Sequence, residues 1–205
     1  MKPYTTIQKE GSFEYEDRKS VFIATAAPVS TESEALDFLS YVKKKYPDAK
    51  HHVYAYVLRE NSIMRFSDDR EPQGTAGMPV LDAIRKNGCV DTAIVVIRYF
   101  GGTLLGTGGL VRAYSSAAVG ALEDANIITY DIYVKTEINV SYSDYQKLLP
   151  IINNTGFRVE DTKYGEKIVI EGRIIKNTLD FFLNLVTDEL SGRAEIKILN
   201  EIFDF

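Results

Sequence analysis

A glycine-rich segment behind a strongly apolar run sets the tightest limit on how this chain can fold. Residues 93–97 are all apolar and predict a buried strand. A helical pattern covers residues 110–125, and between the two lie five glycines: Gly101, Gly102, Gly106, Gly108 and Gly109. Glycine adopts positive φ at little cost and lets other groups approach the backbone closely. The segment therefore predicts a strand, a tight loop and a helix start, whose free N–H groups suit an anion.

Two common nucleotide-binding motifs do not match this segment. A P-loop needs Lys followed by Ser or Thr after its last glycine, and none is present. Val111 stands where a dinucleotide-binding motif has its third glycine. Two interpretations remain open, a tight structural turn and an anion-binding loop. Arg98 and Arg112 flank the loop and favour anion binding.

The rest of the sequence predicts an α+β protein of two domains. The first is expected to form strands at 4–12, 13–19, 21–26, 52–59, 63–66 and 93–97, and helices at 79–87, 110–125 and after a Thr31 cap. The second is expected to form strands at 134–140, 157–162, 167–174 and 194–199, and helices at 143–154, capped by Ser143, and at 179–190. This second order, βαββαβ, is ferredoxin-like. We expect domains at 1–130 and 131–205.

Composition limits the classes of protein and partner. The net charge of −5 divides into −1 for residues 1–130 and −4 for residues 131–205, so an RNA site would have to be a local patch on the first domain. The single cysteine, Cys89, permits no intramolecular disulfide and fits a reducing cytosol. Apolar stretches are no longer than strands, and the first residues lack the apolar core of a secretion signal. We expect a cytoplasmic protein that is not in the membrane.

A polar loop at residues 67–77 offers further candidate chemistry. Asp68, Asp69 and Glu71 could hold Mg²⁺, or they could accept hydrogen bonds from Thr75 and nearby backbone amides. His51 and His52 are neighbours on a strand, so they point to opposite faces and do not share a metal easily. Aromatic and arginine side chains could form a stacking surface for single-stranded nucleic acid, or the rings could be core: Tyr54, Tyr56, Phe66, Tyr99, Phe100 and Tyr114, with Arg59, Arg65, Arg98 and Arg112.

Four stretches together resemble the IMPACT/YigZ family: residues 19–24, 52–56, 68–79 and 98–114. The last two are long and specific, and the resemblance covers the whole chain. It implies a first domain like domain two of ribosomal protein S-five and domain IV of elongation factor G, and a second like that factor's domain V. This pairing suggests RNA or ribosome binding. Eukaryotic relatives regulate translation by blocking a kinase that senses amino-acid starvation, but they use an extra domain, so that role is not carried over.

One position departs from the family pattern. The family usually has Gly where this chain has Arg70, between Asp69 and Glu71. Either the turn does not need positive φ here, or the loop has a different shape. The added positive charge argues against Mg²⁺ and favours a polyanion.

The leading hypothesis is a non-catalytic protein that binds RNA or the ribosome and is linked to translation regulation. The expected anion-binding residues are Arg98, Gly101, Gly102, Gly106, Gly108, Gly109, Arg112 and Tyr114, and those of the motif loops are His52, Asp68, Asp69, Glu71, Gly74 and Thr75. No cofactor or metal is expected, and a protein partner stays open. The alternative is an enzyme acting on a phosphorylated small molecule, with Asp69 or Glu71 as base or metal ligand and His52 assisting.

Overall fold

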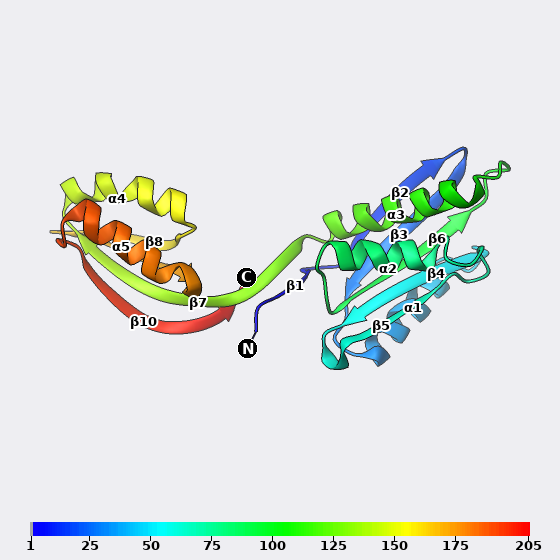
Figure 1. Cartoon of the computed structure of the whole chain (residues 1–205), viewed down its shortest axis with the longest axis horizontal. Coiled ribbons are helices and arrows are strands. Elements are labelled where there is room, and N and C mark those ends of the chain that lie inside the picture. Colours follow the sequence, from blue (N-terminus) through cyan, green and yellow to red (C-terminus); the bar gives the residue numbers. More distant parts are fainter. Residues whose placement is uncertain (1) are drawn as a thin grey trace. The chain divides into compact units, whose positions relative to one another are not determined.

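The computed structural model describes residues 2–205, which form two compact units, residues 4–129 and residues 130–205 together with 2–3 (Figure 1). The first unit contains a five-stranded sheet in the order β2-β3-β6-β4-β5. Its strands are β2 (Gly11–Asp17), β3 (Ser20–Pro28), β4 (His51–Leu58), β5 (Ile63–Ser67) and β6 (Thr92–Tyr99). Its helices are α1 (Glu32–Lys45), α2 (Gly77–Lys86) and α3 (Gly106–Asp124), with a 3₁₀ turn at Glu60–Ser62. Neighbouring strands of this sheet run antiparallel.

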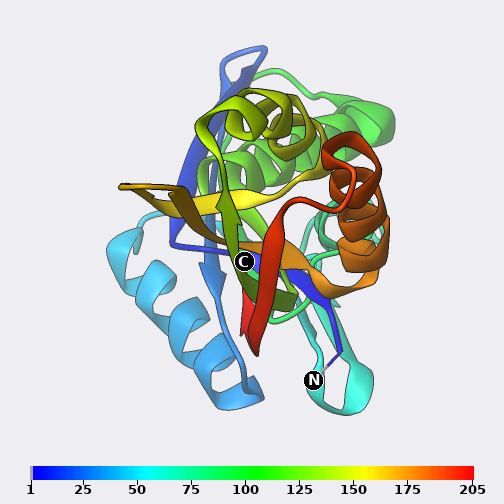
Figure 2. The same ribbon diagram turned by 90° about the vertical axis from the view of Figure 1, so that its left-hand side faces the viewer.

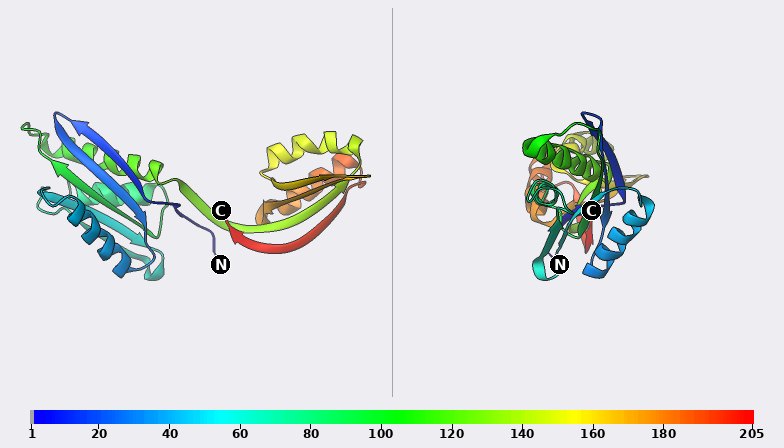
Figure 3. Two further views of the ribbon diagram at one scale, coloured as in Figure 1. Left: turned by 180° about the vertical axis from the view of Figure 1, so that it is seen from behind. Right: turned by 90° about the vertical axis from the view of Figure 1, so that its right-hand side faces the viewer.

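Helices cover both faces of this sheet, α2 and α3 on one and α1 on the other (Figure 3). Alternation along β4 divides its side chains accordingly. Val53 and Ala55 join the core beneath α2 and α3, whereas Tyr56 and Leu58 join the core beneath α1. The expected alternation is confirmed because successive strand residues point to opposite faces.

The second unit follows the order β7, α4, β8, β9, α5, β10, and its strands lie in the spatial order β8-β9-β7-β10. The bounds are β7 (Ile127–Val140), α4 (Tyr142–Thr155), β8 (Arg158–Tyr164), β9 (Ile168–Ile175), α5 (Leu179–Leu190) and β10 (Glu195–Asp204), with a 3₁₀ turn at Lys176–Thr178. Pairing is antiparallel throughout, and α4 and α5 pack on the same face (Figure 2). The ferredoxin-like prediction and the α+β class are therefore confirmed. Within the first unit, the short β1 (Tyr4–Ile7) lies beside the first residues of β7, where Oγ1 of Thr5 is 2.9 Å from Oγ1 of Thr129.

One helix start was predicted correctly, and two others begin earlier than the sequence predicts. Thr31 caps α1 as expected, its hydroxyl accepting from the N–H of Glu34 at 3.2 Å. The cap of α4 is Ser141 rather than Ser143. Helix α3 begins at Gly106, four residues before the apolar pattern at Leu110 becomes visible. The first N–H groups of a helix have no acceptor within it, so this turn is defined by backbone geometry rather than by apolar side chains, and a helix that starts with glycines shows its apolar pattern late.

None of the helices within residues 2–205 is long and apolar enough to cross a membrane.

Candidate nucleic-acid interface

The acidic loop at residues 67–77 is held by its own carboxylates. Asp68 accepts the backbone N–H groups of Gly74, Ala76 and Gly77 at 2.9, 3.1 and 2.8 Å. It thereby caps α2, whose N-cap residue Ala76 makes no side-chain bond. Thr75 supports the same turn, because its hydroxyl donates to the carbonyl of Pro72 at 2.7 Å.

Asp69 ties this loop to the start of β4. Its carboxylate accepts the backbone N–H of His52 at 2.7 Å, and its carbonyl accepts Nδ1 of His51 at 2.8 Å. The imidazole of His52 lies toward α1, with Nε2 at 3.0 Å from the carbonyl of Tyr46. Within residues 2–205, no three His, Cys, Asp or Glu side chains are placed to hold a metal ion together.

Glu71 forms a buried ion pair with Arg98. The guanidinium Nη1 lies 2.8 and 3.1 Å from the two carboxylate oxygens, and the side chains are only 9% and 4% exposed. The hydroxyl of Tyr114 donates to the same carboxylate at 2.8 Å. Burial, and then the charge of Glu71, hold the pKa of Tyr114 far above its usual value, so it remains a donor. We call Glu71, Arg98 and Tyr114 the buried triad.

Arg70 keeps the backbone conformation that glycine would favour. Its φ is +72°, and Asp69 before it has φ +39°. The loop has therefore retained its positive φ while replacing the residue that adopts it most easily. The side chain is 76% exposed and donates to the carbonyl of Lys50 at 2.8 Å.

Arg70→Gly is expected to raise the free energy of unfolding by about 0.5–1 kcal/mol. The gain comes from removing left-handed strain, reduced by the lost surface hydrogen bond and by the flexibility of glycine. Urea denaturation followed by circular dichroism measures it. Arg70→Ala is the matched control, because it removes the same side chain but keeps the Cβ atom; an equal gain in both variants would contradict the strain argument.

The glycine segment is fixed against the turn between β2 and β3. The N–H of Gly101 donates to Oγ of the buried Ser20 at 3.0 Å. A Cβ atom on Gly101 would lie 2.0 Å from the carbonyl carbon of Lys19, so only glycine allows this approach. The chain then passes through Gly102, at φ +86°, and exposes Leu104 before α3 begins. That helix has no side-chain cap and no acidic residue in its first turn, where Gly106, Gly108 and Gly109 lie.

Exposed basic side chains gather at this end of the first unit. Here β3 begins beside the end of β6, and β4 begins beside the same end, as the pairs Val21–Tyr99 and His51–Arg98 show. Five exposed cations lie near these strand ends or in the first turns of α3: Arg18, Lys19, Lys50, Arg70 and Arg112. Arg112 makes one long ion pair, at 3.6 Å to Asp17, and remains 67% exposed. We call these five side chains, with the start of α3, the basic end.

A pocket of 490 Å³ opens at the basic end. Its lining comes from the turn before β4, the start of β4, the end of β6 and the glycine segment: Asp48, Lys50, His51, Arg98, Tyr99, Phe100 and Leu104. Sequence reasoning considered His51 only as a metal ligand, and it missed Lys50 and Leu104 as candidates. The one sequence clue was that Leu104 is an apolar residue between the glycines of a tight loop, where its side chain is not expected to be buried in the core.

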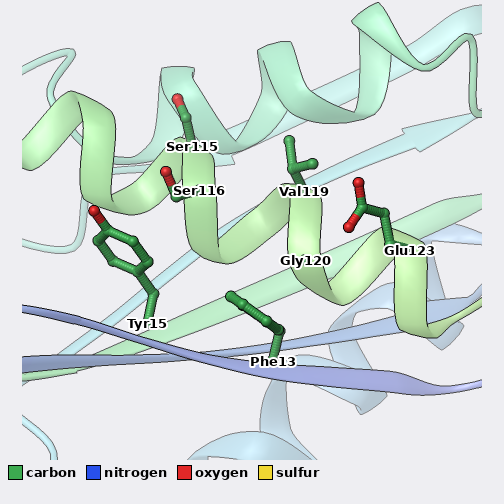
Figure 4. A pocket seen from close by; sticks show the side chains of 7 residues that line it. All are labelled: Phe13, Tyr15, Ser115, Ser116, Val119, Gly120 and Glu123. Atoms are coloured by element: carbon green, nitrogen blue, oxygen red, sulfur yellow. The ribbon is translucent and has the colours of Figure 1, made fainter.

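A second pocket, between β2 and α3, has a different character (Figure 4). Phe13 packs against Gly120 there, and a Cβ atom on Gly120 would lie 2.3 Å from the Phe13 ring. The lining includes Glu123 and no basic side chain. This pocket is therefore unsuited to a phosphate.

The structure thus separates residues that the sequence placed together. The residues of the buried triad face inward, so Tyr114 is not a surface contact and Arg98 is reached only from the pocket, whereas Arg112 and the glycine segment are accessible. Of the side chains considered for a stacking surface, Phe66, Phe100 and Arg65 are exposed, whereas Tyr114 is buried. Tyr56 is buried and donates to Glu32, and Arg59 pairs with Asp91 at the opposite end of β4. Alternation alone could not show which face a helix covers.

Comparison with known proteins gives a consistent assignment. Residues 18–122 match the Impact N-terminal domain, and residues 138–193 match a domain of unknown function, DUF1949. The chain is 33% identical to the IMPACT family member YvyE of Bacillus subtilis, covering 95% of this chain and 90% of that one. It is 32% identical to an IMPACT family member of Haemophilus influenzae, covering 91% and 92%.

Two further similarities agree. YigZ of Escherichia coli is 43% identical over 52% of this chain and 54% of its own. A crystal structure of a hypothetical protein superposes with a TM-score of 0.60 at 26% identity, covering 98% of both chains. The matched domains and the near full-length relatives show that this chain belongs to the IMPACT family.

Proposed function

We propose that this chain is a non-catalytic RNA-binding protein that acts in translation regulation, and that the basic end is its RNA-binding surface. The observation that carries the proposal is the separation of charges at this end. The acids of the motif loops are turned inward and satisfied, whereas five cations and the uncapped start of α3 face outward. Exposed cations and free backbone amides are the groups that contact phosphate oxygens.

The enzyme alternative lacks available groups. Glu71 is engaged by Arg98 and Tyr114, and Asp69 by the backbone of His52. A general base must reach the proton that it removes. The described contacts instead use these side chains to hold the loops in place, which favours binding over catalysis.

The cations of the second unit are largely paired with acids. Helices α4 and α5 leave one face of the sheet uncovered. On that face, cations form ion pairs with acids on neighbouring strands, including Lys135 with Glu160 at 3.2 Å and Lys197 with Glu137 at 2.7 Å. Lys163 and Arg173 are paired in the same way, with Glu171 and Asp204. Because acids lie beside these cations, this face carries little excess positive charge to attract a phosphate backbone.

RNA binding is expected to weaken steeply with salt and to depend on the basic end. Each phosphate contact adds about 0.7 to the slope of log K against log salt for single strands. Lys19→Ala and Arg112→Ala should each lower the affinity and reduce that slope by about 1 or less. Fluorescence anisotropy of a labelled RNA over a salt series measures both quantities.

Arg85→Ala combined with Lys86→Ala is the matched control, because these exposed cations end α2 at the opposite end of the sheet. The control should bind RNA as the unmodified protein does. Absence of binding to RNA and to ribosomes at low salt would overturn the proposal, as would equal losses in the control and in the basic-end variants.

A further inference from the structure

We infer that the pocket at the basic end holds one unstacked base of single-stranded RNA, so that the surface selects single strands over duplexes. This inference rests on the proposed function and names the form of RNA that the site accepts.

The pocket combines apolar side chains that the fold leaves exposed. Phe100 is 56% exposed and Leu104 is 81% exposed, although both lie in a segment that Gly101 anchors to the turn between β2 and β3. An anchored loop cannot easily turn these side chains into the core. A planar base would cover them, and stacking on an aromatic ring is the usual way in which proteins hold single-stranded bases.

The aromatic wall is supported from behind. The guanidinium of Arg98 lies 5.6 Å from the ring centre of Phe100 and 5.5 Å from that of Phe22. Arg98 is in turn held by Glu71, so the buried triad sets the position of the guanidinium beneath Phe100. Arg98 is nine-tenths buried, and its Nε has no hydrogen-bond partner within the described residues. One buried N–H donor of the guanidinium is therefore left without an acceptor.

Polar groups suited to a nucleotide line the same pocket. The carbonyl of Asp69 can only accept, so Nδ1 of His51 carries the hydrogen, and in the neutral ring Nε2 is an acceptor. A base amino group or a ribose hydroxyl can donate to such an atom. Lys50 supplies a positive charge, and the lining acid, Asp48, accepts from the hydroxyl of Tyr99 at 2.9 Å.

Size and position favour a base attached to its strand. The volume of 490 Å³ is within the range of small-ligand sites, about 300–1,000 Å³. Lys50 lines the pocket, Arg70 donates to the carbonyl of Lys50, and the backbone of Lys19 lies against Gly101, so phosphates next to an inserted base would meet positive charge. In a duplex the bases are stacked and paired, and none can enter without being extruded.

The test compares three labelled RNAs of equal length: a single strand, the same strand with its bases removed, and a duplex. The single strand and its abasic counterpart carry the same phosphates, so a difference between them measures base recognition alone. We expect the single strand to bind about ten-fold more tightly than the abasic strand, the effect of stacking one base. Phe100→Ala should abolish that difference while leaving abasic binding unchanged.

Two further variants keep the test decisive. Phe181→Ala removes an equally exposed phenylalanine from α5 and should leave all three affinities unchanged. Phe100→Trp should retain the preference, and because the chain contains no other tryptophan, its fluorescence should be quenched by the single strand and not by the abasic strand.

The outcomes distinguish this inference from the proposed function. One outcome is that all three RNAs bind equally, with an affinity that Phe100→Ala does not change and Lys19→Ala lowers. That result would contradict the inference of a base-binding pocket but would still support the RNA-binding surface. Failure of every RNA to bind at low salt would overturn both.

Discussion

Glu71→Gln is expected to destabilise the first unit by about 3–5 kcal/mol, the largest effect of any conservative substitution in the motif loops. Arg98 would keep its positive charge in a site where its side chain is only 9% exposed, without a carboxylate to compensate it. The hydroxyl of Tyr114 would also lose its charged acceptor. A buried charge without a partner costs far more than the net stabilisation that the intact pair provides.

Hydrogen exchange measured by mass spectrometry resolves this effect within the chain. Peptides from β6 and α3 should exchange faster in Glu71→Gln, while peptides from residues 140–205 provide an internal reference. Glu60→Gln changes an exposed acid in the same unit and should have almost no effect.

A paired variant separates charge from packing. Glu71→Leu together with Arg98→Met removes both charges and should recover a substantial part of the loss, because apolar replacement of a buried pair is often near neutral. If the double variant were as unstable as Glu71→Gln, shape rather than charge balance would explain the triad.

Gly101→Ala is expected to destabilise the same unit by about 3 kcal/mol and to weaken RNA binding. Its Cβ atom would lie 2.0 Å from the carbonyl carbon and 2.3 Å from the carbonyl oxygen of Lys19, so the backbone of one segment must move. Overpacking against backbone is costly because backbone cannot change rotamer. The movement would break the bond from Gly101 to Ser20 and release Phe100 and Leu104 from their positions.

Gly108→Ala is the matched control for this clash. Nothing lies within 4 Å of a Cβ atom on Gly108, and the residue is in the first turn of α3. Alanine favours helix over glycine by about 0.8–1 kcal/mol in a helix interior, so the control should be neutral or slightly stabilising. Urea denaturation and RNA titration of both variants provide the comparison, and equal stability of the two would show that the close approach of Gly101 to Lys19 is not needed.

Elements with a strong local signal were predictable. The apolar run at 93–97 forms the buried strand β6, and Thr31 caps α1. These features depend on neighbouring residues and on the period of the side chains, both of which are visible in a linear sequence. The start of α3 was placed four residues late, because glycines in a first turn have no apolar pattern.

The roles of the motif residues were less predictable. From the sequence, Asp68, Asp69 and Glu71 allowed a metal site but favoured a hydrogen-bonded loop, and the structure shows three hydrogen-bonded carboxylates with different partners. Lys50 and Leu104 carry no motif of their own, so their place beside the glycine segment followed only from the arrangement of β4 and β6.

By itself the sequence determined the two-domain α+β architecture, the ferredoxin-like order of the second domain and the glycine segment as the place where the backbone is open. Only the tertiary structure decided which polar side chains face the interior. Glu71 lies 27 positions from Arg98 and 43 from Tyr114, and Gly101 lies 81 positions from Ser20. The energy of a charged side chain depends on the distance to its partner and on how completely water is excluded around it. Neither quantity can be read from the linear sequence.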